Sequence, residues 1–165
     1  MAGACEKAEN TYSNLHAKFV MDQVLQVAPL RIACESKAEF CMVFLGQGTF
    51  VFQSFKDTKE LPRTAIQDYQ GCLMGLAGFL VGQPNIPDDS NPLVCYDAAC
   101  PNCYADRSMT KRLKLTDTSM AQCEACQRIY NLDDHGYVFR GDEGKRLIRY
   151  RAVYSTATAT LVISN

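Results

Sequence analysis

The feature that most constrains this chain is a pair of Cys-x-x-Cys motifs. Cys100-Pro-Asn-Cys103 is followed, after nineteen residues, by Cys123-Glu-Ala-Cys126. Two pairs separated by about 15–20 residues have the spacing of a metal site. A turn with two intervening residues directs both sulfurs toward one ion, and its backbone amides can hydrogen-bond those sulfurs. Two such turns complete a tetrahedron with metal–sulfur distances of about 2.3 Å. The sequence therefore predicts that the four cysteines meet around one ion.

Zinc is the preferred ion, because it is redox-inert and four cysteines leave it no open coordination position. Iron, as a single ion or as a [2Fe–2S] cluster, accepts the same thiolate ligands. The short spacing within both pairs favours chelation of a single ion over a cluster. Two disulfides are the metal-free alternative in an exported protein. A redox-active Cys-x-x-Cys motif is disfavoured, because neither pair is expected at a strand-to-helix turn.

The charge of the chain is balanced, with 17 Lys and Arg residues against 18 Asp and Glu residues. This balance gives no electrostatic reason to expect nucleic acid as a partner. Four thiolates around a divalent ion leave a charge of about −2, which nearby basic residues would offset. Five candidates lie close to the motifs in sequence, although they also fit a solvated face: Arg107, Lys111, Arg112, Lys114 and Arg128.

Beyond residue 29, short runs rich in Val, Phe, Tyr, Ile and Thr alternate with turn residues, which indicates consecutive strands. Residues 156–163 show the alternation of a half-buried strand. The pattern predicts a mainly-β fold, an antiparallel β-sandwich or barrel. Residues 10–28 are expected to hold one or two helical turns, residues 30–35 and 39–45 to form strands, and residues 57–70 to hold a short helix.

Three runs of sequence resemble Rieske iron–sulfur domains. Leu93-Val-Cys-Tyr-Asp-Ala-Ala-Cys-Pro-Asn-Cys103 and Cys123-Glu-Ala-Cys-Gln-Arg-Ile-Tyr-Asn-Leu132 resemble the two cluster-binding loops of that family. The run from Gly136 to Val153 is similar to the strand region that follows those loops. The resemblance covers residues 78–163, about half of the chain, and implies a Rieske-like β fold.

The ligands depart from the Rieske pattern, in which one iron of the cluster is held by two histidines. The matching positions are Cys103, with one extra residue before it, and Cys126, whereas His16 and His135 lie outside both loops. The resemblance therefore implies a Rieske-like domain with an all-cysteine site. The sequence pattern of this chain is also similar to that of bacterial envelope lipoproteins that carry such a domain.

The N-terminus, Met1-Ala-Gly-Ala-Cys5, lacks the positively charged segment and apolar run expected of a signal peptide, but small residues before a cysteine are similar to the end of a lipoprotein signal. Cys5 is therefore a candidate for lipid attachment, and a lipid would anchor the protein to a membrane without spanning it. A frayed terminus with an incidental thiol is the alternative. No apolar stretch approaches the ~20 residues that a bilayer span requires.

Among the other cysteines, Cys34 and Cys41 would face each other across a hairpin formed by residues 30–35 and 39–45. Opposed antiparallel positions lie close enough for a disulfide, and two buried small residues are the alternative. Cys72 and Cys95 lie in apolar runs and are expected to be buried, inert thiols. His135 is expected to be an exposed turn residue.

Together these features predict an N-terminal segment, residues 1–28, followed by a single β domain, residues 29–165. A rubredoxin-like or zinc-ribbon-like metal-loop subdomain is expected at about residues 96–132. No pairing of a nucleophile with a base and no phosphate-binding glycine loop is present. The expected function is that of a non-catalytic, exported cell-envelope protein with a structural metal and an unidentified protein partner. The alternative is an electron carrier with iron on the same cysteines.

Overall fold

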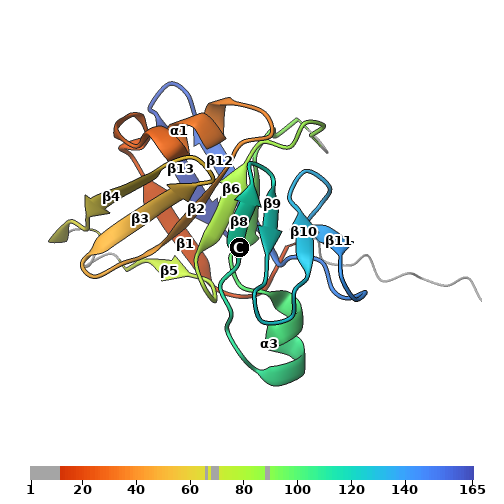
Figure 1. Ribbon diagram of the computed structural model, residues 1–165. Helices are drawn as coiled ribbons and strands as arrows, with labels where there is room; N and C mark the ends of the chain where they lie inside the picture. The colour runs from red at the N-terminus through yellow and green to blue at the C-terminus, as the bar shows by residue number, and fades with distance from the viewer. Residues whose placement is uncertain (1–11, 66, 68–70, 88–89) are drawn as a thin grey trace, which may run out of the picture.

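The computed structural model describes residues 12–65, 67, 71–87 and 90–165 and contains two antiparallel sheets (Figure 1). The large sheet has nine strands in the order β4-β3-β2-β6-β7-β12-β13-β1-β5. Its strands are β1 (Ala17–Met21), β2 (Phe40–Leu45), β3 (Thr49–Ser54), β4 (Thr58–Pro62), β5 (Leu73–Met74), β6 (Phe79–Gly82), β7 (Val94–Asp97), β12 (Arg149–Ser155) and β13 (Thr160–Ser164).

The small sheet has four strands in the order β11-β10-β9-β8. Its strands are β8 (Lys114–Asp117), β9 (Met120–Gln122), β10 (Ile129–Asn131) and β11 (Tyr137–Arg140). The helical elements bounded within the described residues are η1 (Val24–Gln26), α1 (Ala28–Glu35) and α3 (Pro101–Arg107), and Ala65 and Gln67 are helical as well. The predicted mainly-β, antiparallel class is confirmed.

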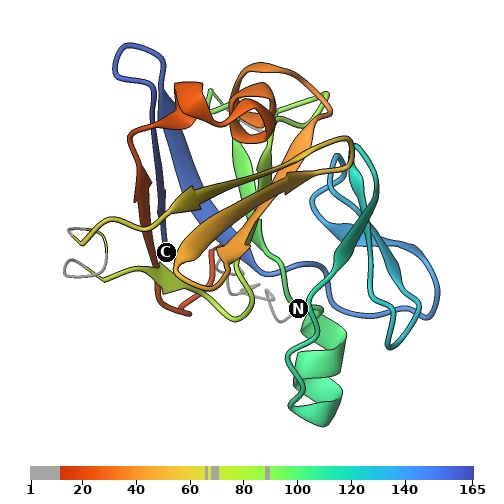
Figure 2. The same cartoon turned by 60° about the vertical axis from the view of Figure 1, so that its left-hand side comes forward.

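The large sheet curls so that its two halves face each other (Figures 1 and 2). Phe19 of β1 packs edge-to-face on Phe50 of β3, with ring centroids 5.3 Å apart, although several strands separate β1 from β3 in the sheet order. Phe79 of β6 contacts both Phe19 and Tyr150 of β12. A flat sheet could not bring these rings together. Phe19, Phe50, Phe79, Tyr150 and the buried residues around them form a first hydrophobic core inside the curl.

A second hydrophobic core lies on the other face of β2, β6 and β7. Side chains alternate across these strands: Val81 and Cys95 point into the first core, whereas Leu80 and Tyr96 point into the second. Strands buried on both faces read as continuous apolar runs, as β6 and β7 do. The small sheet supplies the other side of this second core, through Tyr130 and its neighbours.

The small sheet belongs to an insertion between two neighbouring strands of the large sheet. β7 and β12 pair directly, with Tyr150 opposite Cys95, and residues 98–148 leave after β7 and return at β12. The insertion contains α3 and β8–β11, which lie beside the large sheet in Figure 1. All four cysteines of the two Cys-x-x-Cys motifs therefore lie in this insertion.

The structure differs from three local predictions, of which the first is wrong and the other two are wrong only in part. Residues 28–35 form α1 rather than a strand: Pro29 stands in its first turn, and the buried Leu30, Ala33 and Cys34 have helical spacing. Residues 58–62, in the range expected to hold a short helix, form β4, which pairs with β3 at the sheet edge, and helix is seen at Ala65 and Gln67 of the same range. Residues 17–21, in the range expected to hold one or two helical turns, form β1 between β13 and β5, and one helical turn, η1, follows in that range.

Within the described residues, no helix combines the length and the apolar character needed to cross a membrane.

Candidate metal centre

The first cysteine pair lies at the start of α3. Cys100 is the N-cap residue, Pro101 occupies the first turn, and Cys103 follows one turn later on the same side of the helix. The Cys100 amide donates to the Lys111 carbonyl at 2.8 Å, which fixes the entry into the helix. The expectation that neither pair lies at a strand-to-helix turn is therefore wrong for this pair, because α3 follows β7 after three residues.

The second pair lies in the turn between β9 and β10. The Cys123 amide donates to the Arg128 carbonyl at 2.9 Å, and the Gln127 amide donates to the Cys123 carbonyl at 2.8 Å. The amides of Ala125 and Cys126 hydrogen-bond the Cys123 sulfur, as expected for a turn that presents thiolates to an ion. Gln127 has φ 65°, the left-handed region that favours glycine, and this conformation closes the turn.

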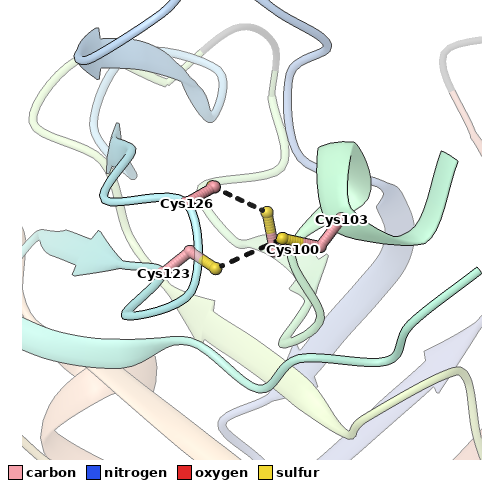
Figure 3. A group of neighbouring side chains, drawn as sticks. All are labelled: Cys100, Cys103, Cys123 and Cys126. Atoms are coloured by element: carbon pink, nitrogen blue, oxygen red, sulfur yellow. Dashed lines mark hydrogen bonds between the residues drawn. The ribbon is translucent and has the colours of Figure 1, made fainter. Parts of the chain in front are cut away.

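The four sulfurs form one compact group (Figure 3), all within 4.8 Å of one another. The Cys100 and Cys126 sulfurs are 3.7 Å apart, and so are those of Cys103 and Cys123. A tetrahedron with metal–sulfur bonds of about 2.3 Å has sulfur–sulfur edges of about 3.8 Å. Both of these pairs already have this edge length, so the group could hold one metal ion.

The cysteines differ in their access to solvent. Cys100 and Cys123 are fully buried, Cys103 is 2% exposed, and Cys126 is partly exposed. The group therefore has three sulfurs facing the second core and one at the surface.

Tyr130 and Asn102 support the buried side of the site. The Tyr130 hydroxyl lies 3.1 Å from the Cys100 sulfur and accepts a hydrogen bond from the Asn102 side chain at 2.8 Å. Asn102 also donates to the Lys145 carbonyl and accepts from the Lys145 amide, at 3.0 and 2.9 Å. A Cβ on Gly144 would collide with the Asn102 amide, so this contact requires glycine. The first turn of α3 is thereby fixed to the segment that returns to β12.

Arg128 supports the exposed side. Its amide and its guanidinium both hydrogen-bond the Cys126 sulfur. The same guanidinium donates to the carbonyls of Asp142 and Glu143, at 2.9 and 3.2 Å. Of the five basic residues considered from the sequence, Arg128 is thus placed to offset thiolate charge.

Two of the other basic residues, Arg112 and Lys114, contact groups other than the four sulfurs. Arg112 stacks over Phe44 at 4.1 Å and donates to the Ala77 carbonyl. Lys114 forms an exposed ion pair with Glu124.

The surroundings of Cys103, Cys123 and Cys126 shift the pKa values of these thiols in different directions. Burial raises the pKa of Cys103 to about 12 and also raises the pKa of Cys123. At Cys126 burial acts in the same direction, but the hydrogen bonds from Arg128, Cys123 and Cys100 together outweigh it, and the pKa falls to about 7. In the absence of a metal, the Cys103 thiol therefore holds its proton at neutral pH.

Cys34 and Cys41 do not face each other across a hairpin, because Cys34 lies in α1 and Cys41 in β2. Both are buried free thiols in the structure, and burial raises the pKa of Cys34 to about 12. The argument for a disulfide from strand opposition is therefore wrong, and a bond between the two stays a prediction. Cys95 is fully buried, as expected, whereas Cys72 is partly exposed.

The two histidines lie apart from the four-cysteine cluster, and Cys5 lies outside the residues that the structure describes. His135 is half-buried in the turn between β10 and β11, where its ring packs against Tyr137, and His16 is an exposed residue that precedes β1. Among the described residues, the one group able to hold a metal consists of the four cysteines. Cys5 lies outside the described residues, so lipid attachment there stays a prediction.

A buried carboxylate next to the insertion escaped the sequence reasoning. Asp97, at the end of β7, is fully buried and accepts hydrogen bonds from the amides of Leu76, Ala77 and Ala99 and from the Tyr150 hydroxyl. Burial raises its pKa above the ordinary value, although all these donors act to lower it. Asp97 fixes the point at which the chain leaves the large sheet. The one signal in the sequence was a charged residue that ends an apolar run.

Comparisons of this chain with protein-family models, with curated proteins and with solved structures gave no significant match.

Proposed function

We propose that this protein binds one zinc ion through Cys100, Cys103, Cys123 and Cys126, and that the ion has a structural, non-catalytic role. The observation that carries the proposal is the convergence of four sulfurs from two separate segments to within 4.8 Å. Four thiolates fill a tetrahedral zinc shell, so no position remains for a substrate or a reactive water. The ion would join α3 to the turn between β9 and β10, and its binding free energy would add to the free energy of folding.

The sulfur spacing supports a single ion over a [2Fe–2S] cluster. In such a cluster each iron takes two cysteines, so sulfurs bound to different irons lie farther apart than one tetrahedral edge. The four sulfurs here would have to divide into two separated pairs, whereas every pair is within 4.8 Å. A single iron ion fits the same tetrahedron and is the second candidate. The partly exposed Cys126 favours it in one respect, because an electron could leave through this ligand.

We also propose that the protein has a Rieske-like arrangement, with its metal loops inserted between two adjacent strands of a larger β domain. The insertion of residues 98–148 between β7 and β12 supports this arrangement. The insertion therefore fits a metal-loop subdomain within that larger domain.

We propose in addition that the protein is exported to a bacterial cell envelope, carries a lipid on Cys5 and binds a protein partner. Phase partitioning in a detergent that separates lipoproteins tests the lipid. The full chain should enter the detergent phase, and a Cys5→Ala variant should not.

The decisive experiment is metal analysis of protein purified without oxygen, together with its visible spectrum. One zinc per chain and no colour would support the structural role, whereas iron with charge-transfer bands would indicate electron transfer. Replacement of zinc by cobalt should give the strong visible bands of a tetrahedral thiolate complex.

Two buried cysteines provide the matched variants for this experiment. Cys123→Ala should lose the metal, whereas Cys95→Ala, which removes an equally buried sulfur outside the cluster, should retain it. Fully reduced protein that takes up no metal, or a Cys123→Ala variant that retains it, would overturn the proposal.

A further inference from the structure

Two short sulfur–sulfur contacts join the two motifs. The Cys100 sulfur is 3.7 Å from that of Cys126, and the Cys103 sulfur is 3.7 Å from that of Cys123. A disulfide has an S–S length of about 2.05 Å, so each pair has to close by less than 2 Å, or about the length of one bond. We infer that the site has a second, metal-free state, in which oxidation by a peroxide joins Cys100 to Cys126 and Cys103 to Cys123. The starting state of this reaction rests on the proposed zinc site.

Solvent access determines where the oxidation begins. Cys126 is the one partly exposed member of the group, because Cys100, Cys103 and Cys123 are all buried. Oxidation of a thiolate follows its exposure, so the peroxide reaches Cys126 first. The Cys100 sulfur lies 3.7 Å from it across the two motifs. Once these two are joined, Cys103 and Cys123 remain as neighbours, so the first step fixes the second pair.

The chemistry balances with one peroxide for each disulfide. The Cys126 thiolate attacks an oxygen of hydrogen peroxide, the O–O bond breaks, and hydroxide leaves, which gives a sulfenic acid. The Cys100 thiolate then attacks the Cys126 sulfur, the S–O bond breaks, and a second hydroxide leaves. Two protons from solvent convert both hydroxides to water. The sulfurs lose two electrons, the peroxide gains them, and zinc is released as its thiolate ligands disappear.

The oxidised state keeps the connection that the metal provides. Each cross-motif disulfide joins α3 to the turn between β9 and β10, over sequence separations of 26 and 20 residues. Disulfides within the two motifs, Cys100 to Cys103 and Cys123 to Cys126, would instead leave these segments unlinked. The same four side chains thus hold the insertion together with zinc under reducing conditions and with disulfides under oxidising conditions.

The test is a titration of the zinc-loaded full chain with hydrogen peroxide, with zinc release followed by a chromogenic chelator. Two equivalents of peroxide should release one zinc per chain and remove four free thiols. Peptide mapping without reduction should find the two cross-motif disulfides, and a thiol reductant with added zinc should restore the starting state.

Two variants sharpen the test. Cys126→Ser removes the exposed thiol and should slow disulfide formation at the site by at least about tenfold in metal-free protein. Cys72→Ser, which removes a partly exposed cysteine outside the cluster, should leave the rate unchanged.

Oxidation of reduced, metal-free protein by peroxide tests the cross-motif disulfides separately from the proposed zinc site. Failure to bind zinc would contradict the proposed function, but the disulfide map of metal-free protein would still test the inference. Disulfides within each motif, or zinc that stays bound after peroxide is consumed, would overturn it.

Discussion

If the four cysteines hold a structural ion, removal of the ion should destabilise the protein far more than the loss of a buried sulfur does. We compare Cys123→Ala with Cys95→Ala, because both side chains are fully buried and only Cys123 belongs to the cluster. Deleting either sulfur removes one small buried group, which costs about 1–2 kcal/mol. This part of the effect should be equal with and without metal.

The metal contributes a separate amount that depends on its free concentration. At free zinc 1,000-fold above the dissociation constant, binding to the folded state adds about 4 kcal/mol. For a chain of this size, 1 kcal/mol corresponds to about 2–4 °C in melting temperature. Excess chelator should therefore lower the melting temperature of the unaltered protein by roughly 8–16 °C.

The assay is thermal or urea unfolding under reducing conditions, in zinc-buffered solution and in excess chelator. Cys95→Ala should show the full response to chelator, and Cys123→Ala should show none. In zinc, Cys123→Ala should be less stable than Cys95→Ala by about 4 kcal/mol. Equal destabilisation of the two variants in zinc, or an unaltered protein insensitive to the chelator, would refute the reasoning.

Three further predictions concern single features of the site and its surroundings. Zinc binding at pH 7 should release at least about two protons, because Cys103 and Cys123 have raised pKa values and must lose their protons to bind. Affinity should then fall at least about 100-fold for each unit by which the pH is lowered, and calorimetry in buffers of different ionisation enthalpy that found fewer than two protons released would contradict this prediction. Gln127→Gly should be more stable than Gln127→Ala by about 1 kcal/mol, because glycine adopts the left-handed region without strain; equal urea midpoints would contradict the assigned conformation. Asp97→Asn should lower the free energy of unfolding by about 3–5 kcal/mol, since an amide nitrogen would face two of the donors that now bind the carboxylate; a cost below about 1 kcal/mol in urea unfolding would contradict this network.

Local sequence reasoning succeeded where the information is short-range. The spacing within each Cys-x-x-Cys motif encodes a turn that directs two sulfurs the same way, so the four candidate ligands were correctly brought together. Alternation in residues 156–163 likewise located the last strand, β13, although not its bounds. The prediction of secondary structure from sequence failed at residues 28–35, because a short apolar run there fits a strand and a helix equally well.

The sequence by itself therefore determined the donor set and the mainly-β class, because both depend on residue types and spacings along the chain. Tertiary structure decided which sulfurs of the two motifs meet, which one meets solvent and which distant side chains support them. Tyr130 reaches the Cys100 sulfur, and Asn102 reaches Tyr130 and Lys145, because the fold packs these segments of the insertion together. These contacts join residues far apart in sequence, and the pattern of any single segment carries no information about them.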